Sequence, residues 1–374
     1  MKLMHGGNLR KAQELYGLNS YLDLSANINP FGPPLGVWAS IQQRMGEIVN
    51  YPDPENKGLR ETLAHKTELP LEMIMVGNGA GELIFTIINA LKPKKVLIPI
   101  PTFSEYERAA RSVEANVSYI TLGSDGWNKF NKRDDKILKF GEQDELDKFW
   151  RKSLEGCDLL FLCSPHNPTG SLLEISLLER ILKISKEQGC FVLFDESFLD
   201  FLPDNVRHSA RSFLADYEHL IVLYSLTKFY SLPGLRLGAA FAHPQLINRF
   251  EKHRDPWSVN VIAQYAGITA LTDVNYSKTV REKLNDSKNF FYQEFEKGQF
   301  TELRLWPSSV NFALIQVLND SVKELIHYLG LRGILVRDCS SFEGLEGNYI
   351  RVAMKDVKAM KQLIKGLKDF YFPS

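Results

Sequence analysis

Short apolar runs alternate with segments of helical spacing through the first two thirds of the chain. The segment 158–163 is apolar from its second residue onward, which is typical of a strand buried on both faces. Segment 172–188 then places apolar residues at helical intervals, and Gly189 follows at a position where helices often end. Two more apolar runs, 190–194 and 220–224, each begin about 30 residues after the previous run, a spacing that predicts strand–helix–strand units and a largely parallel sheet.

Two earlier apolar runs, 73–76 and 96–100, extend this predicted sheet toward the N-terminus. The pattern changes after about residue 245. Beyond that point long polar helical segments precede short strand-like pieces at 311–317 and 349–353. The C-terminal third therefore has a different organisation from the segment before it.

Length and this change of pattern together predict two domains. A chain of 374 residues is longer than one simple core usually supports. We expect a large α/β domain over residues 45–245 and a small α+β domain over residues 246–374. The N-terminal arm, residues 1–44, is expected to join the small domain and to reach the functional site.

Composition and charge exclude several classes of protein. Lys plus Arg and Asp plus Glu number 45 each, so net charge gives no reason to expect nucleic acid or an anionic membrane as partner. The chain starts without an apolar signal core, and none of its segments approaches the roughly 20 apolar residues that span a bilayer. The four cysteines form no Cys-x-x-Cys pair and the eight histidines show no metal-ligand spacing. We therefore expect a reduced, cytoplasmic protein without a metal site.

Polar side chains follow three of the predicted strands. Asn167 lies in the turn after the first strand, Asp195 ends the second, and Lys228 follows the third. Each residue alone is ordinary, since an Asp at a strand end is usually a turn former and a Lys there is usually a surface charge. Ligands of α/β sheets bind beyond the carboxyl ends of the strands. The convergence of an amide, a carboxylate and an amine on one sheet edge is therefore informative.

This combination matches the needs of pyridoxal 5′-phosphate (PLP). The cofactor requires a lysine for a Schiff base, a carboxylate beside its ring nitrogen and a donor to its phenolic oxygen. Segment 76–82 supplies glycines that open a helix, whose free amides form an anion site. A dinucleotide fingerprint fails there, because Glu82 stands where its third glycine is required. Ser225, Thr227 and Arg236 can add hydroxyls and a cation for the phosphate.

Segment 225–238 resembles the PLP-lysine signature of the fold-type I aminotransferases, and segments 166–170 and 195–198 follow the family's order and distances. The resemblance implies a mostly parallel seven-stranded sheet. It implies that Lys228 forms the Schiff base and is later a general acid/base, and that Asp195 pairs with the ring nitrogen. The implied cofactor-binding residues are Tyr51, Gly79, Ala80, Gly81, Phe103, Asn167, Asp195, Ser225, Thr227, Lys228 and Arg236.

Segment 51–54, with Leu59-Arg60, resembles a segment of the histidinol-phosphate aminotransferase branch. In that branch it reaches the cofactor phosphate of the neighbouring subunit. The resemblance therefore implies a homodimer with shared active sites, to which Tyr51 contributes across the interface.

A finer resemblance points to the threonine-phosphate decarboxylases of cobalamin biosynthesis. It rests on segments 5–8, 25–30, 257–260, 336–339 and 344–353. In that family Arg351 would hold the substrate carboxylate, and Arg337 would handle the phosphate. The implied substrate-binding residues are His5, Gly6, Asn27, Asn167, Arg337 and Arg351.

Two positions and one short segment depart from the common pattern of the wider family. Phe198 stands where many relatives have Tyr, so Asn167 alone must bond the phenolic oxygen. His166 stands where Asn is commoner, and its role is open. Segment 80–83 lacks the hydroxyls that relatives often place there, so phosphate binding must rely on backbone amides, Ser225, Thr227 and Arg236.

Several functions share these residues. Decarboxylation and transamination need the same set, so a histidinol-phosphate aminotransferase is the first alternative. Threonine phosphate and serine phosphate differ by one methyl group, which a pocket distinguishes by only about 1–3 kcal/mol. A PLP-binding transcription regulator is disfavoured by the zero net charge and by a match that begins near residue 5. Retention of Lys228, Asp195 and Arg236 disfavours an inactive scaffold.

Overall fold

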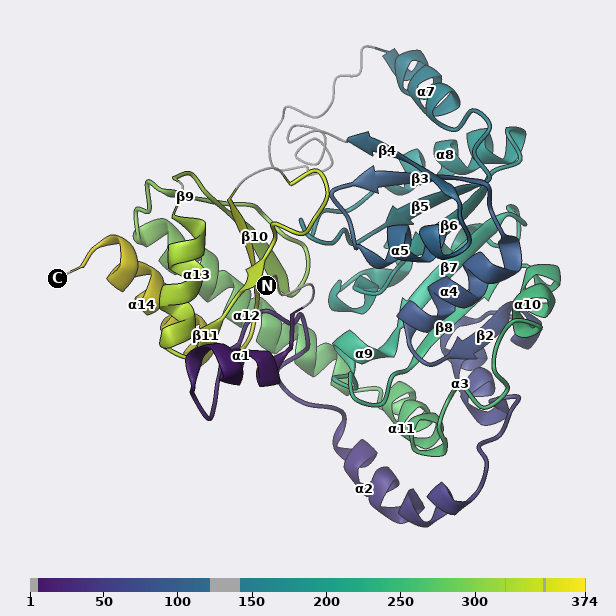
Figure 1. The fold of residues 1–374 in the computed structure, drawn as a ribbon. Coiled ribbons are helices and arrows are strands. Elements are labelled where there is room, and N and C mark those ends of the chain that lie inside the picture. The colour runs from purple at the N-terminus through teal and green to yellow at the C-terminus, as the bar shows by residue number, and fades with distance from the viewer. Residues whose placement is uncertain (1–5, 122–141, 320, 346–347, 374) are drawn as a thin grey trace.

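The computed structural model describes residues 6–121, 142–319, 321–345 and 348–373. Its main sheet has seven strands in the order β2-β8-β7-β6-β5-β3-β4 (Figure 1). Strands β3 to β7 pair in parallel, whereas β8 runs antiparallel to both β7 and β2. The strands are β2 (Ile74–Gly77), β3 (Lys95–Ile100), β4 (Asn116–Thr121), β5 (Leu159–Cys163), β6 (Phe191–Asp195), β7 (Leu220–Ser225) and β8 (Gly238–Ala242).

The predicted fold class is confirmed, and each apolar run of the large domain corresponds to a strand. Central strands such as β7 are buried at every position, because helices cover both faces of the sheet. Strands β4 and β8 were not predicted. β4 is an edge strand of half-buried residues, and β8 is short and made mainly of Gly and Ala, so neither forms a long apolar run.

Two hydrophobic cores lie on opposite faces of this sheet. Along β3, Leu97 belongs to one core while Val96 and Ile98 belong to the other, as expected for alternating side chains. The helices of this part are α3 (Lys57–Thr67), α4 (Ala80–Leu91), α5 (Glu105–Ser112), α7 (Glu142–Ser153), α8 (Ile175–Glu187), α9 (Leu226–Phe229), α10 (Pro244–Glu251) and α11 (Val261–Thr272). Short 3-10 helices are η2 (Leu71–Met73), η3 (Leu199–Phe201), η4 (Asn205–His208) and η5 (Ala210–Phe213).

A second sheet of four strands, in the order β12-β13-β10-β9, has a core of its own. Its strands are β9 (Leu303–Leu305), β10 (Phe312–Val317), β12 (Arg337–Asp338) and β13 (Tyr349–Ala353). The helices that contribute to this core are α12 (Tyr276–Lys297), α13 (Val322–Leu331) and α14 (Val357–Tyr371).

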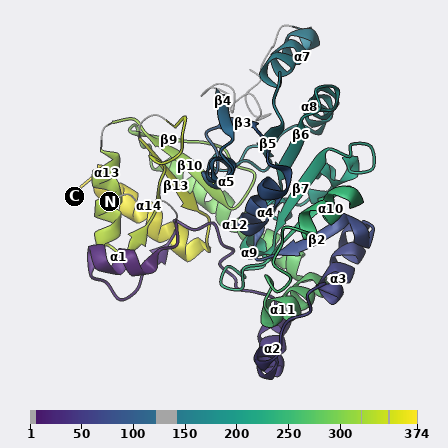
Figure 2. The same cartoon turned by 45° about the vertical axis from the view of Figure 1, so that its right-hand side comes forward.

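The N-terminal segment joins this second region. Strand β1 (Leu22–Asp23) pairs in parallel with β11 (Ile334–Leu335), and α1 (Leu9–Tyr16) contacts α13 (Figures 1 and 2). The next elements, α2 (Leu35–Arg44) and η1 (Met45–Val49), pack beside α11, and α2 lies at the bottom of both views (Figures 1 and 2). The exact domain boundaries at residues 44 and 245 stay predictions.

None of the helices in the described residues combines the length and the apolar character that crossing a membrane requires.

Candidate active site

One cavity of about 710 Å³ lies where the carboxyl ends of β5, β6 and β7 face the second sheet. It is lined by almost every described residue that the sequence singled out for the site. These lining residues are Gly6, Asn27, Ala80, Gly81, Phe103, Asn167, Asp195, Ser225, Thr227, Lys228, Arg236, Arg337 and Arg351. Gly79 and Tyr51 do not line this cavity, and His5 lies outside the described residues.

Lys228 lies in the short helix α9, which directly follows β7. Ser225 caps this helix, because its Oγ accepts the N–H of Thr227 at 3.3 Å. Burial, followed by the charges of Arg236 and Arg351, lowers the pKa of Lys228 to about 8. An appreciable fraction of its amine is therefore neutral near pH 7 and able to attack a carbonyl carbon.

Asp195 ends β6 and is buried. Its Oδ1 accepts the N–H of Ser197 at 2.8 Å, and its Oδ2 accepts the phenol of Tyr106 at 2.6 Å. Tyr106 was not predicted as a site residue. A signal was present in the sequence, because Tyr106 stands one helical turn after Phe103 and both follow the end of β3.

The segment that opens α4 forms a cradle next to Arg236. Gly79 precedes this helix with a φ of +89°, and a Cβ there would lie 2.7 Å from Nη2 of Arg236. A Cβ on Gly238 would similarly lie 2.6 Å from the backbone nitrogen of Ala80. Glycine is thus required for the close approach of these segments. The first amides of α4, together with Arg236, form a site suited to a phosphate.

Arg351 and Arg337 are buried and occupy directly opposite positions on β13 and β12. Arg351 donates from Nη1 to Oδ1 of Asn167 and from Nη2 to the carbonyl of Ser25 at 3.4 Å. Within the described ranges, Nε of Arg351 is buried without a hydrogen-bond partner, and no carboxylate forms an ion pair with this arginine. Burial lowers the pKa of Arg351 to about 10, so it remains a cation at neutral pH.

The N-terminal segment lines the cavity beside these arginines. Gly6 passes so close to the chain that a Cβ would lie 2.1 Å from the carbonyl oxygen of Ser25. Asn27 is buried, and its Oδ1 has no hydrogen-bond partner among the described residues. Ser341 accepts a hydrogen bond from Nη2 of Arg337 at 2.8 Å and also lines the cavity. Ser341 was not predicted as a site residue from the sequence, although it lies only four positions after Arg337.

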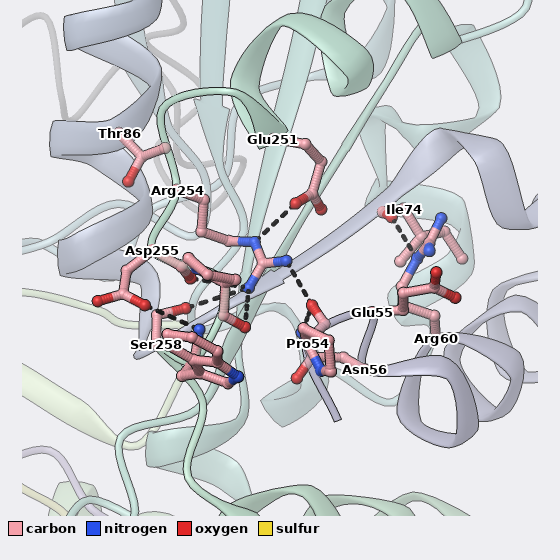
Figure 3. A network of polar contacts seen from close by, with 12 residues as sticks. Pro54, Glu55, Asn56, Arg60, Ile74, Thr86, Glu251, Arg254, Asp255 and Ser258 are labelled. Atoms are coloured by element: carbon pink, nitrogen blue, oxygen red, sulfur yellow. Dashed lines mark hydrogen bonds and ion pairs between the residues drawn. The ribbon is translucent and has the colours of Figure 1, made fainter. Parts of the chain in front are cut away.

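Tyr51 lies outside the cavity of its own chain. Its side chain is 80% exposed, and its ring centroid lies 4.7 Å from that of Trp257. The loop after Tyr51 is fixed by Arg254, which donates from Nη2 to the carbonyl of Pro54 at 2.8 Å and pairs with Glu251 (Figure 3). The predicted role of Tyr51 therefore requires a second subunit.

His166, whose role the sequence left open, connects two loops of the site. One ring nitrogen, Nε2, lies 2.9 Å from the carbonyl of Pro101, and Nδ1 lies 2.8 Å from Oγ1 of Thr169. Burial lowers the pKa of His166 to about 3, so the ring is neutral. Nε2–H then donates to Pro101, and Nδ1 accepts from Thr169. His166 thus joins the loop of Asn167 to the loop that leads to Phe103.

Comparison with known proteins decides the family. The model for aminotransferase class I and II matches residues 19–367. The chain belongs to this family. Enzymes of the family depend on pyridoxal 5′-phosphate, so the prediction of an enzyme with this cofactor is confirmed.

Three relatives illustrate the similarity. Threonine-phosphate decarboxylase of Salmonella typhimurium is 34% identical over 98% of this chain and 96% of its own length. The adenosylcobalamin biosynthesis bifunctional protein CobDQ of Leptospira interrogans is 31% identical over 98% of this chain, which spans 41% of that protein. The crystal structure of histidinol-phosphate aminotransferase from Clostridium acetobutylicum superposes with a TM-score of 0.81, at 26% identity, over 93% of this chain and 98% of that one.

Proposed function

We propose that this enzyme removes the carboxylate of an O-phospho-L-amino acid. The pair of buried arginines carries the proposal, because like charges at directly opposite positions of two strands repel each other. Arg337 lowers the pKa of Arg351 further for this reason. A substrate with both a carboxylate and a phosphate would form charge-assisted hydrogen bonds with these two arginines.

The residues of the cavity fit PLP. Lys228 would bond the cofactor through Nζ, Asp195 would face the ring nitrogen, and Asn167 would face the phenolic oxygen. The phosphate would lie at the amides of Ala80 and Gly81, with contacts from Ser225, Thr227 and Arg236. Phe103 would stack on the ring. Once bound, the cofactor withdraws electrons from a bond at the Cα of the amino acid.

The protein groups would then position the substrate and move its proton. Arg351 would hold the carboxylate, while Arg337 with His5, Gly6 and Asn27 would hold the phosphate. Nζ of Lys228, which lines the same cavity as Arg337 and Arg351, would be available as a proton donor to the substrate. We propose that Nζ of Lys228 delivers the proton that Cα takes up as CO₂ leaves.

The substrate is proposed from the relatives. L-threonine O-3-phosphate would yield 1-aminopropan-2-ol O-2-phosphate, and L-serine O-phosphate would yield ethanolamine O-phosphate. Either product would serve as the linker of a cobamide nucleotide loop. The similarity to a threonine-phosphate decarboxylase and to a protein of adenosylcobalamin biosynthesis supports this assignment. We place the enzyme in the cytoplasm, with no nucleic-acid or membrane partner.

We also propose that two copies share their active sites. Large apolar side chains are exposed on α2 and η1, the elements that precede Tyr51. They are Leu35, Trp38, Met45, Ile48 and Val49. A second copy would cover this surface and receive Tyr51 at its cofactor phosphate.

Histidinol-phosphate aminotransferase is the second candidate, favoured by the similarity to the Clostridium acetobutylicum enzyme. A substrate panel separates the two functions. PLP-loaded enzyme is given L-threonine phosphate, L-serine phosphate or histidinol phosphate while CO₂ and the cofactor spectrum are followed. CO₂ release with the cofactor retained supports decarboxylation, and the rate ratio identifies the substrate. Conversion to the pyridoxamine form by histidinol phosphate or glutamate, without CO₂, would contradict it.

A further inference from the structure

The phenol of Tyr106 contacts the carboxylate that is expected to face the cofactor ring nitrogen. Tyr106 lies in α5, and its OH donates to Oδ2 of Asp195 at 2.6 Å. The other oxygen, Oδ1, accepts the backbone N–H of Ser197 at 2.8 Å. Donors that belong to this chain therefore hold both oxygens of Asp195.

The surroundings of Tyr106 keep its phenol protonated and in place. Tyr106 is buried, and its ring stacks on Phe161 with centroids 4.7 Å apart. Burial, with the charge of Asp195 as the second cause, raises the pKa of Tyr106 well above its ordinary value. Phe103 packs edge-on against the same ring at 5.6 Å. One tyrosine thus supports both Asp195 and the aromatic residue expected to stack on the cofactor.

We propose that Tyr106 is a positioning residue that fixes the carboxylate of Asp195 and stabilises its ionised form, so that the proton between Asp195 and the cofactor ring nitrogen stays on nitrogen. A hydrogen bond to a carboxylate favours the charged form and lowers its affinity for a proton. A protonated ring nitrogen makes the cofactor a stronger electron acceptor. This inference rests on the proposed function, because it requires PLP in this cavity.

A purely structural role for Tyr106 would give different results from the proposed one. Tyr106→Phe removes the hydroxyl and retains the ring that stacks on Phe161. Tyr224 provides a matched control, because it is also buried and its OH donates to Asp200. Neither Tyr224 nor Asp200 lines the cavity. Both substitutions remove a buried hydrogen bond between a phenol and a carboxylate. Only the hydrogen bond of Tyr106 lies at the proposed cofactor site.

The experiment uses holoenzyme loaded with PLP that carries ¹⁵N in its ring. We expect the wild-type ¹⁵N signal at the position of a protonated ring nitrogen. In Tyr106→Phe the signal should move toward that of a neutral pyridine, and kcat should fall about 10- to 100-fold with little change in KM, the range expected for loss of a hydrogen bond to a charged group. Tyr224→Phe should have the same stability cost but leave the ¹⁵N signal and kcat unchanged.

A second variant keeps the proposal testable if Tyr106→Phe does not fold. Fluorotyrosine at position 106 keeps the packing and donates a stronger hydrogen bond, so it should move the ¹⁵N signal further toward the protonated position. If Tyr106→Phe keeps the wild-type ¹⁵N signal and kcat, the role of Tyr106 is overturned while the proposed function stands. If the wild-type protein takes up no PLP at all, the proposed function is overturned, and this inference with it.

Discussion

Arg351 donates a hydrogen bond from Nη1 to Oδ1 of Asn167, across 184 positions of sequence. The contact joins β13 of the second sheet to the loop after β5 of the main sheet. Because Oδ1 of Asn167 accepts from Arg351, the Nδ2 donors of this amide, which lines the cavity, are left for another partner. Arg351 therefore orients the predicted donor to the cofactor's phenolic oxygen as well as being placed to bind a substrate carboxylate.

Arg351→Lys should lower kcat/KM by about 100-fold, or about 2.7 kcal/mol, because Lys keeps the charge but loses the planar fork that reaches a carboxylate and Asn167 together. Steady-state kinetics with L-threonine phosphate measures this change. Arg304→Lys is the control, since Arg304 lies exposed on β9 of the same sheet. Equal kcat/KM values for the two variants would contradict the assigned role of Arg351.

Two neighbouring glycines should respond in opposite directions to the same substitution. Gly79→Ala places a Cβ at a positive φ and 2.7 Å from Nη2 of Arg236, so it should cost about 1–3 kcal/mol of stability and weaken PLP binding. Gly81→Ala meets open space inside α4 and should stabilise the fold by about 0.5–1 kcal/mol. Thermal unfolding with and without PLP measures both effects. A stabilised Gly79→Ala variant would contradict the account of the cradle.

His166 should make the protein more sensitive to acid. Burial holds the folded-state pKa of His166 near 3, whereas an unfolded histidine has a pKa near 6.5. The unfolded state therefore binds more protons between these values, and stability falls as the pH falls below about 6.5. His166→Asn should reduce the loss of stability between pH 7.5 and pH 5.5 by roughly 1.4 kcal/mol.

Urea unfolding at the two pH values measures this effect of His166. His253→Asn is the matched control, because it replaces an exposed histidine by the same residue. An identical pH dependence in the wild type and in His166→Asn would show that His166 is not held neutral.

A charge on the exposed apolar surface of η1 should break the proposed dimer. Val49 is 83% exposed and lies two residues before Tyr51. Val49→Asp should give a monomer with weaker PLP binding, because Tyr51 of a second copy would no longer reach the phosphate. Leu318→Asp, an exposed position after β10, should leave both properties unchanged. Sedimentation and PLP titration test this, and a dimeric Val49→Asp variant would contradict the proposed interface.

The sequence predicted the strand ends better than the contacts between them. Asn167, Asp195 and Lys228 could be predicted because parallel strands place their carboxyl ends on one edge of a sheet. The hydrogen bond from Tyr106 to Asp195 could not, since it depends on how the side chain of Tyr106 packs against Phe161 of β5 and Asp195 of β6 rather than on spacing along the chain. The same holds for Arg351 and Asn167, which meet only because the second sheet faces the main one. Strand β8 was not predicted because its Gly and Ala residues do not form a long apolar run.

The fate of the substrate carboxylate tests the central proposal most directly. L-Threonine phosphate labelled with ¹³C in its carboxylate would be incubated with PLP-loaded enzyme in heavy water and followed by NMR. We predict that the label leaves as CO₂ and bicarbonate, and that the amine product gains one deuterium at the former Cα. Label retained in a 2-keto acid, with the cofactor converted to its pyridoxamine form, would contradict decarboxylation and assign the site to transamination.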